Sequence, residues 1–170
     1  MSGTPSGTSG ATETFTIGPV EIDNLSPIQK KALEVIGAGG TMADLRGLTG
    51  EDIETVYSIG FNLYNQAKYA EAEPMFKFAC FYRHLDPRYW MALANCRQMT
   101  KDYQAAIDAY GMSYMFDVDD PWPVIQSAMC YLALENKELA GDSLSLAERA
   151  IRNRPDEKAR QRISALRKAL

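Results

Sequence analysis

Small and large apolar residues recur along this chain at a constant interval of 34 residues. Four kinds of position repeat three times each: a small residue, a second small residue, a large residue and a third small residue. In that order the columns are Gly60, Ala94 and Ala128; Ala72, Ala106 and Ala140; Phe76, Tyr110 and Leu144; and Ala79, Ser113 and Ala147. A fifth column holds Pro87, Pro121 and Pro155. Apolar residues within a unit follow the spacing of amphipathic helices, so the pattern predicts three copies of one helical pair.

This arrangement resembles the tetratricopeptide repeat, a 34-residue unit of a helix, a turn and a second, antiparallel helix. The small residues allow the two helices to approach closely, and the large residue fills the space between neighbouring pairs. One unit cannot bury its own apolar face, so the units must stack. We therefore expect an all-α helical solenoid with repeats at 53–86, 87–120 and 121–154. Three unrelated helix pairs would not keep five columns in register.

The regions that flank the repeats have patterns of their own. Residues 1–24 are rich in Gly, Ser and Thr, and are expected to be a disordered tail. Residues 25–52 form an N-terminal helical segment, in which "GAGG" breaks a first helix and Thr41 and Thr49 are predicted helix caps. Residues 155–170 are predicted to form a C-terminal capping helix. Its apolar stripe consists of Ala159, Ile163, Leu166 and Leu170.

A second apolar stripe on the first helix of each unit indicates a binding surface. In stacked helix pairs these helices line the concave face, and we expect one of their stripes (Val56, Ile59 and Leu63 in the first unit) to form the core. The opposite stripe should face the groove, and it contains Tyr57, Phe61, Tyr64, Met91, Asn95, Gln98, Trp122, Ile125 and Met129. Exposed apolar surface of this kind marks an interaction site. The alternative is that these residues pack on one another or on the C-terminal helix.

Composition and charge exclude several classes of function. The chain of 170 residues has a net charge of −4, which argues against nucleic-acid binding. Residues 149–170 carry eight basic and two acidic residues, a net charge of +6, which fits either a solvated helix face or a docking patch for an acidic partner. Cys80, Cys96, Cys130 and the single histidine, His84, form neither a zinc pattern nor a disulfide framework. We expect no metal, no cofactor, no enzymatic activity and no membrane insertion.

One family shares several specific segments with this sequence. They are Gly39-Gly40-Thr41, "YSIGFNLY" (57–64), Lys68-Tyr69, "CRQ" (96–98) and "AIDAY" (106–110). On these segments the chain resembles the class II type III secretion chaperones, the tetratricopeptide chaperones of translocator proteins in Gram-negative bacteria. The likeness extends from about residue 26 to residue 151.

The resemblance implies a cytoplasmic protein that binds hydrophobic translocators and keeps them soluble, separate and secretion-competent. An extended segment of the translocator would lie in the concave groove on Tyr57, Phe61 and Tyr64. Helix residues Phe78, Tyr82 and Leu85 would also line it. The resemblance further implies a homodimer formed through the N-terminal segment, whose candidate contacts are Ile28, Ala32, Val35, Ile36 and Leu45.

Other functions remain open at this point. A transcriptional co-activator that binds a DNA-binding partner is one alternative, since some members of the family have this second role. A generic scaffold that joins two cytosolic proteins is another, but a scaffold would be expected to have a more polar groove.

Overall fold

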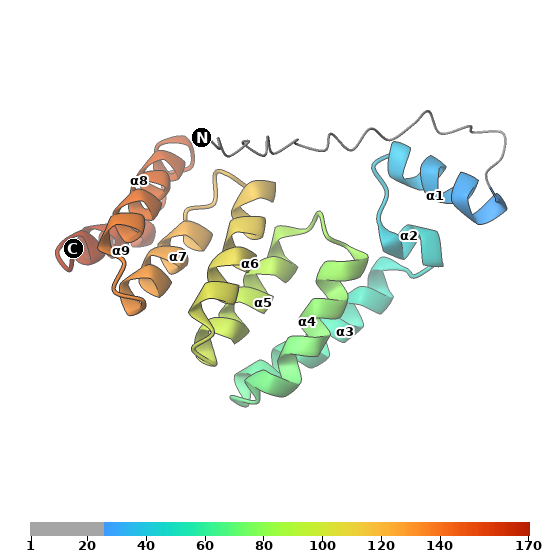
Figure 1. The fold of residues 1–170 in the computed structure, drawn as a ribbon, viewed down its shortest axis with the longest axis horizontal. Coiled ribbons are helices and arrows are strands. Elements are labelled where there is room, and N and C mark those ends of the chain that lie inside the picture. The colour runs from blue at the N-terminus through green and yellow to red at the C-terminus, as the bar shows by residue number, and fades with distance from the viewer. Residues whose placement is uncertain (1–25) are drawn as a thin grey trace, which may run out of the picture.

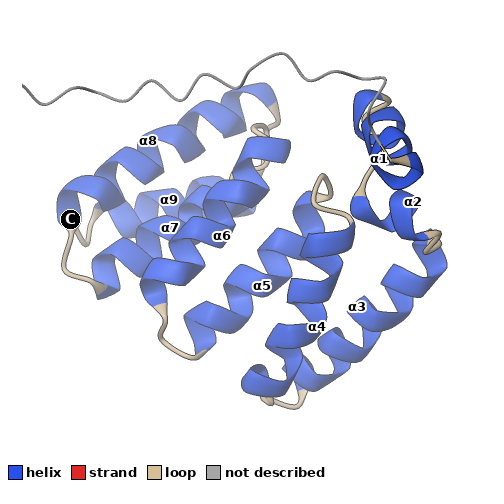
Figure 2. Cartoon of the chain, turned by 45° about the vertical axis from the view of Figure 1, so that its right-hand side comes forward, coloured by secondary structure: helices blue, strands red, loops and turns tan. Residues whose placement is uncertain are grey.

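The computed structural model describes residues 26–170, and every regular element in that range is an α-helix (Figure 2). The helices are α1 (Pro27–Gly37), α2 (Met42–Arg46), α3 (Gly50–Asn65), α4 (Tyr69–Tyr82), α5 (Pro87–Met99), α6 (Tyr103–Phe116), α7 (Trp122–Ala133), α8 (Lys137–Asn153) and α9 (Glu157–Arg167). The tail expected at 1–24 lies outside the described residues, as does the side chain of Ile36.

The helices form a stack of three pairs, α3–α4, α5–α6 and α7–α8, which follow one another in chain order (Figure 1). Helices α1 and α2 lie at one end of the stack, and α9 lies at the other. Helix α9 packs on both α7 and α8, so it covers the last pair. The prediction of an all-α solenoid with N-terminal helices and a C-terminal capping helix is confirmed.

Short polar residues begin several of the helices, as the sequence indicated for Thr41 and Thr49, whereas Lys68 and Pro121 precede α4 and α7. The Thr49 hydroxyl accepts from the Asp52 backbone N–H at 3.1 Å, while the Asp52 carboxylate accepts from the Thr49 backbone N–H at 2.7 Å. The Asp44 carboxylate likewise accepts from the Thr41 backbone N–H at 2.7 Å. The threonine hydroxyls also donate to these carboxylates, at 2.6 Å for Asp52 and 2.7 Å for Asp44. The hydroxyl and backbone N–H bonds together lower the pKa of both carboxyl groups; the hydroxyl bond has the larger effect at Asp52 and the backbone bond at Asp44.

The turn between the two helices of each pair has the same backbone conformation in all three units. Ala67, Lys101 and Glu135 occupy the same position in successive units, and their φ angles are +59°, +64° and +59°. This left-handed conformation strains a residue that carries a Cβ atom. The repeat therefore fixes the turn geometry even where its sequence supplies no glycine.

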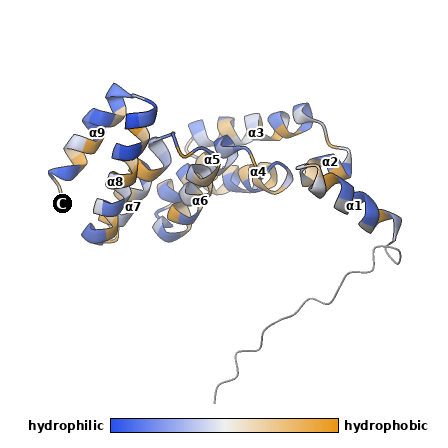
Figure 3. Ribbon diagram, turned by 90° about the horizontal axis from the view of Figure 1, so that it is seen from above, coloured by the Kyte–Doolittle hydropathy of each residue, from blue (hydrophilic) through white to orange (hydrophobic). Residues whose placement is uncertain are grey.

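The small-residue columns are buried where neighbouring helices touch. Ala72, Ala106 and Ala140 are completely buried. At Gly60, an added Cβ atom would lie 2.9 Å from Met75 Cβ and 2.9 Å from Phe76 Cε1, so α3 and α4 meet there too closely for a larger residue. Figure 3 shows apolar and polar positions alternating along the helices, as expected when one face of each helix is buried.

One core prediction is wrong. Ile59 is 49% exposed, although its counterparts one and two units later, Leu93 and Ser127, are buried at 2% and 6%. The main neighbours of α3 are α4 and α5, which both follow it, whereas α5 and α7 also pack on the helices that precede them. The first unit therefore has an open apolar end, because no preceding pair covers that face.

Candidate functional site

The concave side of the first two pairs contains an open cleft of about 340 Å³, which we call the aromatic cleft. Helices α3 and α5 supply most of its walls, and Phe76 of α4, the end of α6 and the turn before α7 complete it. Its lining residues are Tyr57, Phe61, Tyr64, Phe76, Pro87, Arg88, Met91, Ala92, Asn95, Ser113, Asp117 and Asp120. Five of the residues predicted for the groove are among them: Tyr57, Phe61, Tyr64, Met91 and Asn95.

Tyr57 and Phe61 form the aromatic wall but have different roles. The Tyr57 ring packs on Phe76 and on Tyr89, with centroids 5.5 and 5.3 Å apart, so part of it belongs to the core. Burial raises the pKa of its hydroxyl group. Phe61 stacks only on Tyr57 among the described rings, at 6.4 Å, and is 49% exposed. Phe61 therefore presents free apolar surface to a ligand, whereas Tyr57 supports it.

The amide side chains of the predicted groove are engaged within the protein. The hydroxyl oxygen of Tyr110, which is fully buried, lies 2.7 Å from Asn95 Oδ1 and 2.6 Å from Gln98 Oε1. A phenol has one proton, so it donates to only one of these two amide oxygens at a time. Asn95 also lines the aromatic cleft, whereas Gln98 does not.

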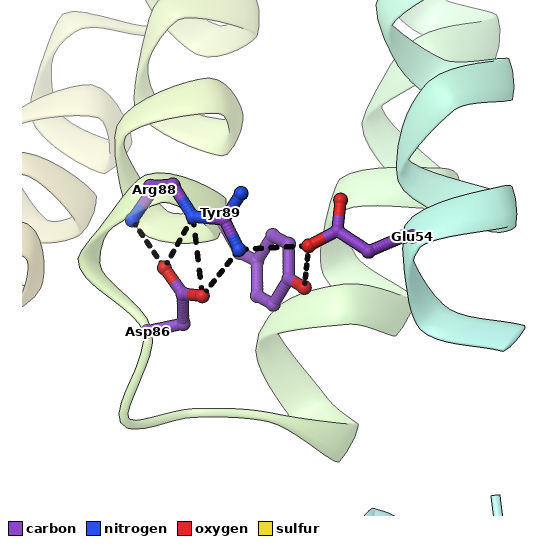
Figure 4. Close-up of polar contacts among 4 residues, drawn as sticks. All are labelled: Glu54, Asp86, Arg88 and Tyr89. Atoms are coloured by element: carbon purple, nitrogen blue, oxygen red, sulfur yellow. Dashed lines mark hydrogen bonds and ion pairs between the residues drawn. The ribbon is translucent and has the colours of Figure 1, made fainter. Parts of the chain in front are cut away.

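A network of charged groups joins the first two units at the rim of the cleft (Figure 4). Arg88 Nη2 lies 2.7 Å from both Asp86 Oδ2 and Glu54 Oε1. Glu54 also accepts from the Tyr89 hydroxyl at 2.9 Å. Burial and this bond raise the pKa of Tyr89 to about 12. Arg88 is thus already neutralised by two carboxylates.

Two further carboxylates, Asp117 and Asp120, line the cleft. Asp117 pairs with both Nη atoms of Arg154, at 3.0 and 2.9 Å, and these bonds lower the pKa of Asp117. Asp120 accepts from the backbone N–H of Trp122 at 2.9 Å and forms no ion pair with any residue in 26–170. Burial raises the pKa of Asp120.

The sequence patterns missed the contribution of Asp117, Asp120 and Ser113 to the cleft, because these residues lie outside the helix stripe that was expected to line it. A signal for them does exist. In a 34-residue repeat, the end of one unit lies beside the first helix of the same unit, so the residues before Pro121 are brought next to α5.

The third unit does not contribute to the cleft, because α9 engages its groove residues. The Trp122 indole N–H donates to Asp156 Oδ2 at 3.0 Å. The Arg162 guanidinium lies 3.1 Å from the Met129 sulfur. Ile125 is completely buried in the core that α7, α8 and α9 share, so it cannot contact a ligand. In this unit the predicted groove residues therefore pack on the C-terminal helix, which was the alternative to a binding surface.

The residues expected from α4 also lie away from the cleft. Phe78 and Tyr82 pack on each other with centroids 4.5 Å apart, and Phe81 meets Tyr82 at 5.0 Å. The prediction that Leu85 is a helix residue is wrong: α4 ends at Tyr82, and Leu85 lies 46% exposed in the turn that precedes α5. The side of α4 that faces the cleft carries Phe76, since residues 78 and 82 are rotated away from it around the helix.

The N-terminal helices expose part of the surface proposed for dimerisation. Helix α1 packs mainly on α2, and Ile28 is 71% exposed. Ala32, Val35 and Leu45 line a cavity of about 230 Å³ together with Met42 and His84. Nothing in residues 26–170 covers the exposed side of α1.

The described residues contain little that suggests a catalytic or metal site. In 26–170 there is no cluster of three or more His, Cys, Asp or Glu side chains that would hold a metal ion, and no helix there is long and apolar enough to cross a membrane. Cys80, Cys96 and Cys130 are buried thiols, and burial raises their pKa values to about 12, 12 and 11. Such thiols are poor nucleophiles at neutral pH.

Fold and site together define a class of protein: a tetratricopeptide-type solenoid with an open aromatic cleft on its concave face, suited to binding another polypeptide. The family model for the tetratricopeptide repeat matches residues 53–86 and 87–117. Low calcium response locus protein H of Yersinia pseudotuberculosis is 32% identical over 133 residues, which cover 78% of this chain and 79% of that protein.

Solved structures agree with this assignment. The translocator chaperone SycD of Yersinia enterocolitica superimposes with a TM-score of 0.72 at 31% identity, covering 77% of this chain and 98% of SycD. SycD in complex with a peptide of the translocator YopD gives a TM-score of 0.67 at 30% identity, covering 71% and 93%. SycD has also been solved as an alternative dimer. The present chain belongs to the class II type III secretion translocator chaperones.

Proposed function

We propose that this protein is a cytosolic chaperone that binds an extended segment of a hydrophobic translocator in the aromatic cleft and keeps the translocator soluble, separate and secretion-competent. The observation that carries the proposal is the exposed aromatic wall around Phe61, on the concave face of a chaperone fold. SycD, a relative with the same fold, has been solved with a peptide of the translocator YopD. The chain would act by binding alone, without catalysis.

The cleft suits a few apolar side chains on an extended backbone. Each side chain that moves from water into an apolar pocket contributes about 1.5–3 kcal/mol. Two or three such anchors offset the entropy lost when a flexible segment becomes ordered, so the complex would be tight enough to persist and still able to dissociate. Asn95 lies beside these anchors and offers a hydrogen bond to the bound backbone.

The proposal is tested by co-expressing the chain with a hydrophobic translocator of a type III secretion system from the same organism, and by measuring the mass of the soluble complex with light scattering. We expect a soluble complex that Phe61→Ala weakens. Phe81→Ala is the matched control, because Phe81 is 58% exposed but lies on α4 outside the cleft. Equal loss with both variants, or a translocator that stays insoluble with the unaltered chain, would contradict the proposal.

The partner proposed for the N-terminal end is a second copy of the chain. Ile28 is mostly exposed on a helix that packs mainly on α2, and Ile59 is exposed at the open end of the first unit. A dimer through this region would remove apolar surface that a monomer leaves in water. Ile28→Asp should halve the mass measured by light scattering without loss of helix content. An unchanged mass would exclude α1 as the interface.

A further inference from the structure

One carboxylate that lines the aromatic cleft, Asp120, forms no ion pair with any residue in 26–170. Arg88 is bonded to Asp86 and Glu54, and Asp117 is bonded to Arg154. Asp120 has no such partner among residues 26–170, although it lines the same cleft and is partly buried. Arg154 offsets the charge of Asp120 only in part, because its guanidinium is bonded to Asp117, so the surface offered to a ligand keeps a net negative charge at this point.

Asp120 is held in place by the backbone around it. Its Oδ1 accepts from the Trp122 N–H at 2.9 Å, at the start of α7, and Pro121 restricts the chain between the two residues. Burial raises the pKa of Asp120; the carboxylates of Asp117 and Asp156 add to this shift, while the Trp122 N–H and Arg154 oppose it. A fixed, partly dehydrated carboxylate gains more from a cation than a mobile one on the surface does.

We propose that the segment bound in the aromatic cleft carries a lysine or arginine side chain close to its apolar anchors, and that Asp120 binds this cation. The inference rests on the proposed function and specifies its substrate: Asp120 would select, among apolar segments, those with a cation at the matching position. The aliphatic stem of the basic side chain would lie along the aromatic wall. The positive charge at the end of that side chain would also be attracted to the ring faces of Tyr57 and Phe61.

An acidic segment fits the cleft poorly. Its carboxylate would meet Asp120 and Asp117, and Arg88, the one cation among the described residues that line the cleft, already contacts two carboxylates at 2.7 Å. A neutral apolar segment would bury Asp120 further without compensation, and desolvating a charge without a partner is unfavourable. A cationic side chain is the ligand group that removes both penalties.

The test is selection of displayed random peptides of twelve residues on the purified, full-length chain. Asp120→Asn is the informative variant, because asparagine keeps an oxygen that accepts from the Trp122 N–H and removes only the charge. Asp142→Asn is the matched control, since Asp142 is exposed on α8 and has no ion pair to any described residue. Phe61→Ala reports separately on the apolar wall.

We expect the unaltered chain and the Asp142→Asn variant to enrich apolar peptides that also contain Lys or Arg. Asp120→Asn should keep the apolar preference and lose the preference for Lys and Arg. The affinity of an individual selected peptide should fall about tenfold, the effect of losing a charge-assisted hydrogen bond.

Two failures can be told apart. Apolar peptides without enriched Lys or Arg, or an unchanged preference in Asp120→Asn, would overturn the inference and leave the proposed function standing. Selection of no apolar peptides, or selection that Phe61→Ala does not affect, would overturn the proposed function itself.

Discussion

Replacing Gly60 by alanine tests how closely α3 and α4 approach beside the aromatic cleft. Gly60 and Gly111 both lie inside helices, in α3 and α6. Alanine is favoured over glycine in a helix interior by about 1 kcal/mol, and both variants gain this amount. At Gly111 an added Cβ atom meets no other heavy atom within 4 Å. Gly111→Ala should therefore stabilise the protein by about 0.5–1 kcal/mol.

At Gly60 the same Cβ atom would lie 2.9 Å from Met75 Cβ and from Phe76 Cε1. Met75 Cβ is fixed to the backbone of α4, and Phe76 is 1% exposed, so neither atom can move away easily. Overpacking of this kind costs about 1–3 kcal/mol. After the gain in helix propensity, Gly60→Ala should destabilise the protein by up to about 2 kcal/mol.

The assay is urea denaturation followed by circular dichroism, with both variants at the same protein concentration so that any association affects them equally. The difference between the two variants cancels the helix-propensity gain and isolates the steric cost, which should be about 1–3 kcal/mol. If Gly60→Ala stabilises the protein as much as Gly111→Ala does, the two helices are not in the close contact described here.

Three further predictions concern the cleft and the repeat turns. Tyr57→Ala should lower the free energy of unfolding severalfold more than Phe61→Ala does, because Tyr57 packs on buried aromatic rings. Phe61→Ala should instead mainly weaken peptide binding; urea denaturation and fluorescence polarisation separate the two effects. Lys101→Gly should raise the urea midpoint, because relief of the strain in its left-handed backbone exceeds the entropic cost of glycine, and a lower midpoint would contradict this. Affinity for a lysine-containing peptide should be greatest above the pKa of Asp120 and should fall as the pH drops through that pKa, since protonation of the carboxylate competes with binding of the cation. Because the pKa of Asp120 is raised, this loss of affinity should begin above the ordinary value of 3.8. In Asp120→Asn the pH dependence should disappear.

Much of the solenoid is predictable from the sequence because the repeat imposes the same contact at each step. A position that must be small in one unit must be small in the next, and Ala94 and Ala128 are both completely buried. The caps at Thr41 and Thr49 were also predictable, since each requires only residues three positions apart. Features that depend on neighbouring residues or on the repeat period can thus be predicted from the sequence alone.

The ends of the stack were not predictable, since periodic reasoning treats every unit alike. Ile59 and Leu93 occupy the same repeat position, yet one is half exposed and the other is buried, because only the second has a preceding pair to pack on. At the other end, α9 closes the groove over Trp122 and Met129. The open part of the groove is therefore confined to the first two units and the turn that follows them.

The shape of this cleft depends on the angle between the first two units, and the Glu54–Arg88 network spans that boundary. Arg88 and Glu54 have 58% and 44% exposed side chains. Their ion pair therefore adds at most about 1 kcal/mol to stability. Tyr89 also belongs to this network, because its hydroxyl donates to the same Glu54 oxygen. Unlike Arg88 and Glu54, Tyr89 has a buried ring, which packs on Tyr57. We infer that the network orients the wall of the cleft more than it stabilises the fold, because its energy is small and it ends on Tyr89, whose ring packs on Tyr57, the residue that stacks on Phe61.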